Sequence, residues 1–220
     1  MADRPDVPVA GPLYPVNLVL GGRRCLVVGG GRVATQKAAG LLECDARVHA
    51  VAPRIGDSLR ALEPADRLSW EERPYRPGEV AGYRLAITAT DDPDVNRRVY
   101  LDGEEHGVWV NSADDPANCA FTLPSRVRQG PLLVTFATGG RSPALATWLR
   151  RRFTDELGPE YATLIEVLAA ERDARRAGGG SSEGLDWQNA LDSGMLDLIR
   201  QDRIAEAKEL LQACLSSSSA

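Results

Sequence analysis

The first half of the chain alternates short apolar runs with stretches of helical apolar spacing. The apolar runs lie at residues 25–28, 48–52, 85–90 and 108–110. Runs of this length without polar alternation are typical of strands that are buried on both faces of a parallel sheet. Residues 33–43 and 95–106 have helical spacing, and residues 55–62 fit a short helix. The pattern predicts an α/β fold with a Rossmann-like, doubly wound parallel sheet.

The pattern changes after Asn111. Two extended segments surround the turn-forming sequence Gln129-Gly130-Pro131, which predicts a small sheet outside the parallel one. Ser142 and Pro143 supply an N-cap and a proline for the first helical position, so a helix should begin there. Beyond a Gly-Pro break, helical spacing continues over residues 160–176 and 185–215.

These changes divide the chain into three predicted parts. Residues 1–113 form the Rossmann domain, residues 114–150 a small α+β segment, and residues 151–220 a helical C-terminal domain. The middle segment is too small to fold stably by itself, so it should depend on its neighbours or on a partner.

The connection after the first predicted strand carries the motif with the most direct chemical meaning. Gly29, Gly31 and Ala34 have the spacing G-x-G-x-x-A between a predicted strand and a predicted helix. The first glycine permits a tight turn, the second lets the backbone approach a pyrophosphate, and the alanine lets the helix pack closely on the strand. The N–H groups at the start of the helix then bind the phosphates. In this context the motif predicts a dinucleotide site, and the alternative is a glycine turn that only packs.

One part of the usual dinucleotide site is absent. An Asp or Glu that binds the adenosine ribose should stand about 20 residues after the glycines, at the end of the second strand. Pro53 and Arg54 occupy this place, and Asp57 is the nearest acidic residue beyond them. Because an arginine here can accommodate the 2′-phosphate of NADP, the residues leave the choice between NAD and NADP open.

Charge adds an asymmetry to this picture. The 220 residues carry a net charge of −5, and 43% hydrophobic with 26% charged residues is an ordinary globular composition. Residues 121–152 nevertheless contain six arginines and no Asp or Glu. Such a block can attract an anionic ligand, and the alternative is a solvated helix face formed by Arg150, Arg151 and Arg152. The chain is acidic overall and the block has few aromatic residues, so nucleic acid is not an expected partner.

The sequence also argues against a membrane, secreted or metal-binding protein. No apolar run approaches the roughly 18 residues that a membrane-spanning helix needs. The N-terminal residues lack the pattern of a signal peptide, so we expect a cytoplasmic location. The four cysteines are widely spaced without a CxxC pair, and the two histidines, His49 and His106, form no ligand cluster. We therefore expect neither a metal site nor a disulfide framework.

The order of five motifs resembles the precorrin-2 dehydrogenase family, whose members use NAD in sirohaem synthesis. The motifs are YPVNL, CLVVGGGRVATQKAAGLL, ITATDDPDVNRRV, VNSADDPANCAFTLPS and ATGGRSPALATWLRRRF, and the similarity covers residues 14 to about 176. The resemblance implies NAD-dependent oxidation of precorrin-2, a reduced tetrapyrrole, to sirohydrochlorin. Several members of the family also insert ferrous iron into sirohydrochlorin, with Fe²⁺ as a substrate. A homodimer is implied as well, in which the segment after Asn111 completes the active site.

The resemblance also implies roles for individual residues. Cofactor contacts fall on Gly29, Gly30, Gly31, Arg32, Val33, Ala34, Pro53, Arg54, Thr88, Thr90 and Asp91. Asp114 matches the proposed catalytic aspartate, and it follows a predicted strand at the sheet edge where ligands of doubly wound folds bind. Ser125 matches a position that influences substrate binding. Because a polycarboxylate needs positive partners, Arg126, Arg128 and Arg141 are expected to bind the tetrapyrrole.

A nucleotide-sensing Rossmann module without catalysis is the alternative from another functional class. It would explain the glycine loop, but it would have no use for Asp114, for the arginine block or for the helical tail. A sensor would bind the nucleotide and form no NADH when the tetrapyrrole is added.

Overall fold

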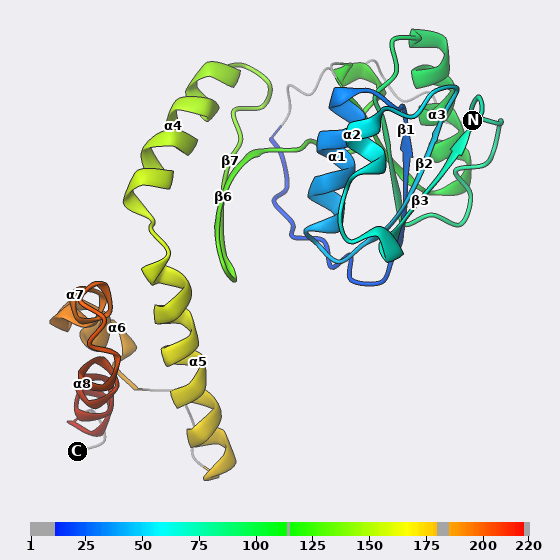
Figure 1. Cartoon of the computed structure of the whole chain (residues 1–220). Coiled ribbons are helices and arrows are strands. Elements are labelled where there is room, and N and C mark those ends of the chain that lie inside the picture. The colour runs from blue at the N-terminus through cyan, green and yellow to red at the C-terminus, as the bar shows by residue number, and fades with distance from the viewer. Residues whose placement is uncertain (1–11, 114, 180–184, 218–220) are drawn as a thin grey trace. The chain divides into compact units, whose positions relative to one another are not determined.

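Residues 12–113, 115–179 and 185–217 are described by a computed structural model, which divides the chain into two units. Unit 1 is Met1–Leu123 and unit 2 is Pro124–Ala220. Unit 1 holds the parallel sheet, and unit 2 holds a small sheet followed by helices (Figure 1). The finer division at residues 113 and 150 stays a prediction.

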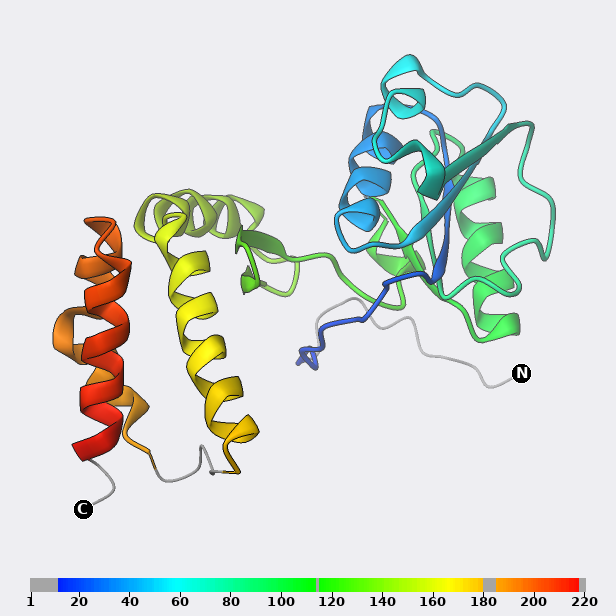
Figure 2. The same cartoon turned by 60° about the horizontal axis from the view of Figure 1, so that its bottom comes forward.

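The sheet of unit 1 has five parallel strands in the order β3-β2-β1-β4-β5. Figure 2 shows helices on the two sides of this sheet. The strands are β1 (Arg24–Val28), β2 (Arg47–Ala52), β3 (Leu68–Glu72), β4 (Leu85–Thr88) and β5 (Trp109–Ser112). The chain starts at the centre of the sheet, moves outward to β3, and then returns to β4 on the other side of β1. This order confirms the predicted α/β class and places a topological switch between β1 and β4.

Helices cover both faces of this sheet. They are α1 (Arg32–Leu42), α2 (Asp57–Arg60) and α3 (Pro93–His106). Val27 packs with Ala38 of α1 on one face, whereas Leu26 and Val28 pack with Val99 of α3 on the other. These three residues of β1 are at most 2% exposed. Burial on both faces explains why this strand shows no polar alternation in the sequence.

The prediction of four strands is incomplete, because β3 forms an additional strand at the outer edge of the sheet. Only Leu68 of its five residues is buried, so β3 lacks the apolar run that marks the other strands. Residues 73–84, which connect β3 to β4, form turns and contain no helix.

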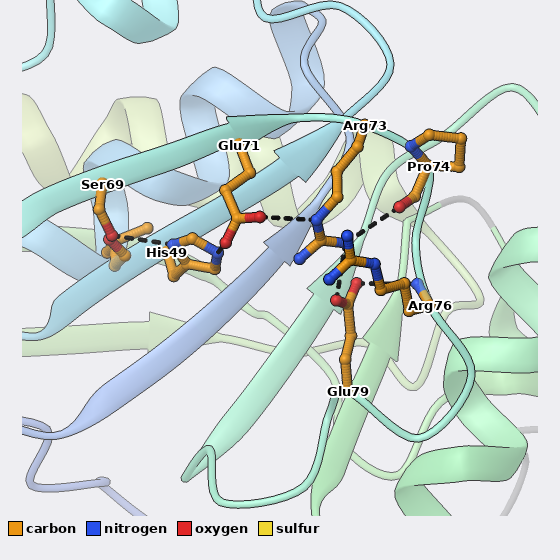
Figure 3. A network of polar contacts seen from close by, with 8 residues as sticks. His49, Ser69, Glu71, Arg73, Pro74, Arg76 and Glu79 are labelled. Carbon is orange, nitrogen blue, oxygen red and sulfur yellow. Dashed lines mark hydrogen bonds and ion pairs between the residues drawn. The ribbon is translucent and has the colours of Figure 1, made fainter.

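A polar network lies on β2 and β3 at this edge (Figure 3). His49 Nδ1 lies 2.9 Å from Ser69 Oγ, and His49 Nε2 lies 3.4 Å from Glu71 Oε1. The Arg73 guanidinium then joins Glu71 at 2.6 Å to Glu79 at 2.8 Å. The side chain of His49 is only 18% exposed, so it is largely shielded from solvent at this edge of the sheet.

Unit 2 begins with the predicted small sheet. Its antiparallel strands are β6 (Ser125–Gln129) and β7 (Leu132–Phe136), and its helices are α4 (Pro143–Glu156), α5 (Glu160–Ala177), α6 (Trp187–Ala190), α7 (Leu196–Arg200) and α8 (Ile204–Ser217). The predicted N-cap of α4 is confirmed, because the Ser142 hydroxyl accepts a hydrogen bond from the Leu145 N–H at 3.2 Å. The later helices share a core that includes Leu164, Met195 and Leu211.

Candidate nucleotide-binding site

Gly29 opens the loop between β1 and α1 at the carboxyl edge of the sheet, with a backbone hydrogen bond to β2 and close packing against the residue that follows β4. Gly29 has a φ of +133°, and its N–H donates to the Val51 carbonyl oxygen at 2.9 Å. A Cβ at Gly29 would lie 2.4 Å from the Ala89 carbonyl oxygen. Both the backbone conformation and the available space therefore require glycine at this position.

Gly30 is held against the segment that follows β2. A Cβ at Gly30 would lie 2.0 Å from the Arg54 carbonyl oxygen, and the Gly56 N–H donates to the Gly30 carbonyl oxygen at 3.0 Å. The structure therefore brings Arg54, which comes directly after Pro53 at the end of β2, against the glycine loop. Both of these side chains are exposed.

Gly31 differs from the other two glycines because a Cβ there would meet nothing within 4 Å. It is the N-cap of α1, which has no side-chain cap and no acidic residue in its first turn. The first-turn N–H groups of Arg32, Val33 and Ala34 therefore have no side-chain partner. Ala34 is fully buried, and its small side chain lets α1 approach the sheet closely. A loop closed by backbone on two sides, with open space and free N–H groups above it, fits the pyrophosphate of a dinucleotide.

The turn after β4 is organised by Asn96, which lies in the first turn of α3 and is 7% exposed. Its Oδ1 accepts hydrogen bonds from the buried Thr88 hydroxyl, from the Thr90 hydroxyl at 2.8 Å and from the Thr90 N–H at 3.3 Å. Its Nδ2 donates to the Thr90 carbonyl oxygen at 3.0 Å. Asp91 is exposed in the same turn.

Thr88 and Thr90 were predicted from the sequence, whereas Asn96 was not. The available signal was the helix start, because Asp92 accepts hydrogen bonds from the N–H groups of Asp94 and Val95 and is followed by a proline. A polar residue in the first turn of such a helix lies at the carboxyl edge of the sheet, close to the strand that precedes it.

The end of β5 lies at the same carboxyl edge of the sheet, beside the end of β4. Asp114 lies outside the described residues. The hydroxyl of Ser112, at the end of β5, is buried and has no hydrogen-bond partner among the residues that the structure describes. The thiol of Cys119 donates to the Ser112 carbonyl oxygen at 3.3 Å, and burial raises the pKa of this thiol. Cys119 is thus a protonated thiol near neutral pH, unsuited to nucleophilic chemistry.

The residues predicted to bind a polycarboxylate lie in unit 2. Arg126 and Arg128 are exposed on β6 with the buried Val127 between them, so strand alternation places both arginines on one face. Ser125 is half-buried at the start of the same strand, and Arg141 is exposed in the turn before α4. The structure therefore brings two of these arginines together on one surface of the small sheet.

The described residues show two further properties. No group of three or more His, Cys, Asp or Glu side chains among them is placed to hold a metal ion. None of their helices has the length and the apolar character needed to cross a membrane.

Comparisons with known proteins find a nucleotide-binding family over this part of the chain. A family model described as "Putative NAD(P)-binding" matches residues 16–125, which is half of the chain. The curated relatives include siroheme synthases from Nitrosococcus oceani (34% identity over 203 residues, 91% of this chain and 43% of the relative), Nitrosomonas europaea (34% over 207 residues, 93% and 44%) and Chromobacterium violaceum (32% over 209 residues, 94% and 44%). The chain thus spans less than half the length of these relatives.

A solved structure described as SirC, precorrin-2 dehydrogenase, has the same fold. It superposes with a TM-score of 0.67 at 24% sequence identity, covering 92% of this chain and 98% of that chain.

Proposed function

This chain belongs to the NAD(P)-binding family whose model matches residues 16–125, and from this premise we propose that it oxidises precorrin-2 to sirohydrochlorin. The observation that carries the proposal is the alignment with siroheme synthases over 91–94% of the chain, which extends from the glycine loop through the arginine block. The fold shared with a precorrin-2 dehydrogenase supports it. The relatives reported above carry the names of biosynthetic enzymes, so the nucleotide-sensing alternative gains no support from them.

In the proposed reaction the tetrapyrrole loses a hydride and a proton. A bound nicotinamide dinucleotide supplies the hydride acceptor, and NAD is the acceptor that the resemblance implies. The N–H groups at the start of α1 would hold the pyrophosphate. Thr88 and Thr90, fixed by Asn96, would position the nicotinamide end.

Asp114 is proposed as the group that accepts the proton. Its support is its place in the sequence, two residues beyond the end of β5, together with the resemblance to the family. Arg126, Arg128 and Arg141 would bind carboxylates of the substrate through bidentate hydrogen bonds, and Ser125 would lie beside them.

The test of this proposal is an anaerobic assay of purified protein with precorrin-2 and either dinucleotide, followed by reduced-dinucleotide absorbance and sirohydrochlorin formation. We expect one reduced dinucleotide per tetrapyrrole oxidised. Asp114→Asn should lower the rate at least about 100-fold, the lower range for a general base, and leave dinucleotide affinity unchanged. Binding of the dinucleotide without turnover would favour a sensor, and an undiminished rate in Asp114→Asn would remove that residue from the mechanism.

We propose iron insertion into sirohydrochlorin as a second activity, on the basis of the resemblance and of the siroheme synthase names of the relatives. Fe²⁺ would be a substrate whose ligands are the tetrapyrrole nitrogens, and Asp114 would accept the protons that these nitrogens release. An anaerobic assay with sirohydrochlorin and Fe²⁺ or Co²⁺, without dinucleotide, tests it. A rate equal to the uncatalysed one would exclude this activity.

We also propose that the protein is a cytoplasmic homodimer. The support for the dimer lies in α4, which buries only Ala146 among its 14 residues and leaves Leu145 and Trp148 47% and 54% exposed. A two-stranded sheet with such a helix has little core of its own, and a second copy would supply the missing cover. Light scattering at micromolar concentration should give the mass of two chains.

A further inference from the structure

Two arginines flank the glycine loop where the adenosine end of a dinucleotide binds. In a Rossmann fold the adenosine ribose lies near the end of the second strand, and Arg54 follows the end of β2 by two residues. Arg32 is the first residue of α1. Both side chains are exposed, and neither forms a hydrogen bond or an ion pair within the described part of the chain. Their charges are therefore available to a ligand.

The backbone of Arg54 is held at this place. Its carbonyl oxygen occupies the space that a Cβ of Gly30 would need, and the neighbouring Gly56 N–H is bonded to the Gly30 carbonyl oxygen. Because the side chain is long and exposed, we expect its guanidinium group to reach the space beside the loop.

Two acidic residues lie nearby, and the carboxylate of Glu72 is already bonded within the protein. Glu72 ends β3, and its Oε1 accepts a hydrogen bond from the Ile55 N–H at 3.1 Å and pairs with Arg60 at 2.7 Å. These two contacts, the Ile55 N–H first, lower the pKa of Glu72 and direct its carboxylate toward α2. Asp57 is exposed at the first residue of α2, three residues beyond Arg54.

We propose that Arg54, assisted by Arg32, binds the 2′-phosphate of NADP and makes the protein prefer NADP to NAD. A guanidinium group forms bidentate, charge-assisted hydrogen bonds with a phosphate. The absence of a carboxylate at the end of β2 removes both the usual partner of the NAD ribose and the charge that would repel a 2′-phosphate. The inference rests on the proposed function, since it concerns the same dinucleotide site, and it replaces the NAD that the resemblance implies.

The test is calorimetric titration of the full chain with NAD⁺ and with NADP⁺, without tetrapyrrole. We expect NADP⁺ to bind at least about 10-fold more tightly, within the range for hydrogen bonds to a charged group. Arg54→Ala should weaken NADP⁺ binding about 10-fold or more and change NAD⁺ binding less than about 2-fold. Arg32→Ala should have the same selectivity with a smaller effect. Arg54→Glu should reverse the preference, because its carboxylate repels the phosphate and binds the ribose hydroxyls.

Arg47→Ala is the matched control. Arg47 is an exposed arginine at the first residue of β2, the opposite end of the strand from Arg54, so both affinities should stay as in the wild type. Equal or tighter binding of NAD⁺ by the wild type, or an equal loss for both dinucleotides in Arg54→Ala, would overturn the inference. A selective loss of NAD⁺ affinity in Glu72→Gln would assign the ribose to Glu72 and also overturn it.

The outcomes separate this inference from the proposed function. If the protein oxidises precorrin-2 with NAD⁺ and shows no preference for NADP⁺, only the role of Arg54 is wrong. If neither dinucleotide binds, both the role of Arg54 and the proposed dehydrogenase function are wrong.

Discussion

Unit 1 and the first part of unit 2 bury their apolar residues to different degrees. Strand β1 is covered on both faces, and the helix after the glycine loop buries four of its 11 residues. Helix α4 is longer, yet it buries only Ala146. The proposed nucleotide site of unit 1 thus lies on a scaffold with a well-buried core, whereas the proposed substrate arginines lie in the region of β6, β7 and α4, on a surface that a second chain would complete. Substitutions in the two regions should therefore act on different properties.

The largest expected effect is that of Gly30→Ala in unit 1. The added Cβ would lie 2.0 Å from the Arg54 carbonyl oxygen, so the loop and the segment after β2 must separate. Forcing an extra group into a packed site costs about 1–3 kcal/mol of stability. Because the displaced loop would carry the pyrophosphate, dinucleotide affinity should fall at least about 100-fold, as measured by calorimetry, while the mass in light scattering stays unchanged.

Gly31→Ala is the matched control that separates the loss of stability from the loss of dinucleotide affinity. Its Cβ meets nothing within 4 Å, and Gly31 has a φ of −89°, so the variant should fold as stably as the wild type. It should still weaken dinucleotide binding, because the methyl group lies above the open side of the loop. Equal stability and equal affinity for Gly30→Ala and the wild type would contradict the packing described for this loop.

The next largest effect concerns unit 2. Trp148→Asp places a charge on the exposed face of α4, where the Arg152 guanidinium lies 5.6 Å from the Trp148 ring centroid. If this face is the dimer interface, the dimer dissociation constant should rise at least about 30-fold, which corresponds to about 2 kcal/mol for a central aromatic residue. Sedimentation measures it. Dinucleotide affinity should stay unchanged, and an unaltered dimer would move the interface elsewhere.

Asn96→Ala is expected to have a smaller effect that is confined to unit 1. The substitution leaves the buried Thr88 hydroxyl and the groups of Thr90 without their shared partner. The loss should lower the stability of unit 1 by about 1–3 kcal/mol and weaken dinucleotide binding less than Gly30→Ala does. Urea unfolding measures the stability. Asn189→Ala in the helical part of unit 2 is the control, and it should leave dinucleotide affinity unchanged.

The strands and the loop of unit 1 could be predicted because local patterns define them. An uninterrupted apolar run, three glycines and a helical repeat follow one another in the sequence around Gly30. In unit 2, the Ser142-Pro143 cap is an equally local pattern. Strand β3 escaped prediction because four of its five residues are exposed at the sheet edge. Asn96 escaped because its importance depends on hydrogen bonds to residues of another element. The packing of the Arg54 carbonyl on Gly30 is likewise a tertiary contact, and the spacing of residues in the sequence does not predict it.

The smallest expected effect is a pH dependence of unit 1, which contains both histidines of the chain. Burial lowers the pKa of His49 from its usual value of 6.5, and Glu71 only partly opposes this shift. The unfolded chain therefore takes up a proton at a higher pH than the folded chain does. Stability is full above about pH 6.5 and declines as the pH falls toward the lower pKa of the folded state. Hydrogen bonding to Arg73 lowers the pKa of Glu71 from 4.5, so its contribution is lost only in more acidic solution.

Hydrogen-exchange protection of β2 and β3, corrected for the intrinsic effect of pH, tests this prediction between about pH 7.5 and pH 5.5. Protection should decline in the wild type and in His106→Gln, which changes the other histidine, and it should stay level in His49→Gln. The helices of unit 2 contain no histidine, so their protection should not change over this range. An equal decline in His49→Gln would show that the network around His49 does not cause the pH dependence of protection. A decline shared by α5 and α8 would mean that the two units do not respond to pH separately.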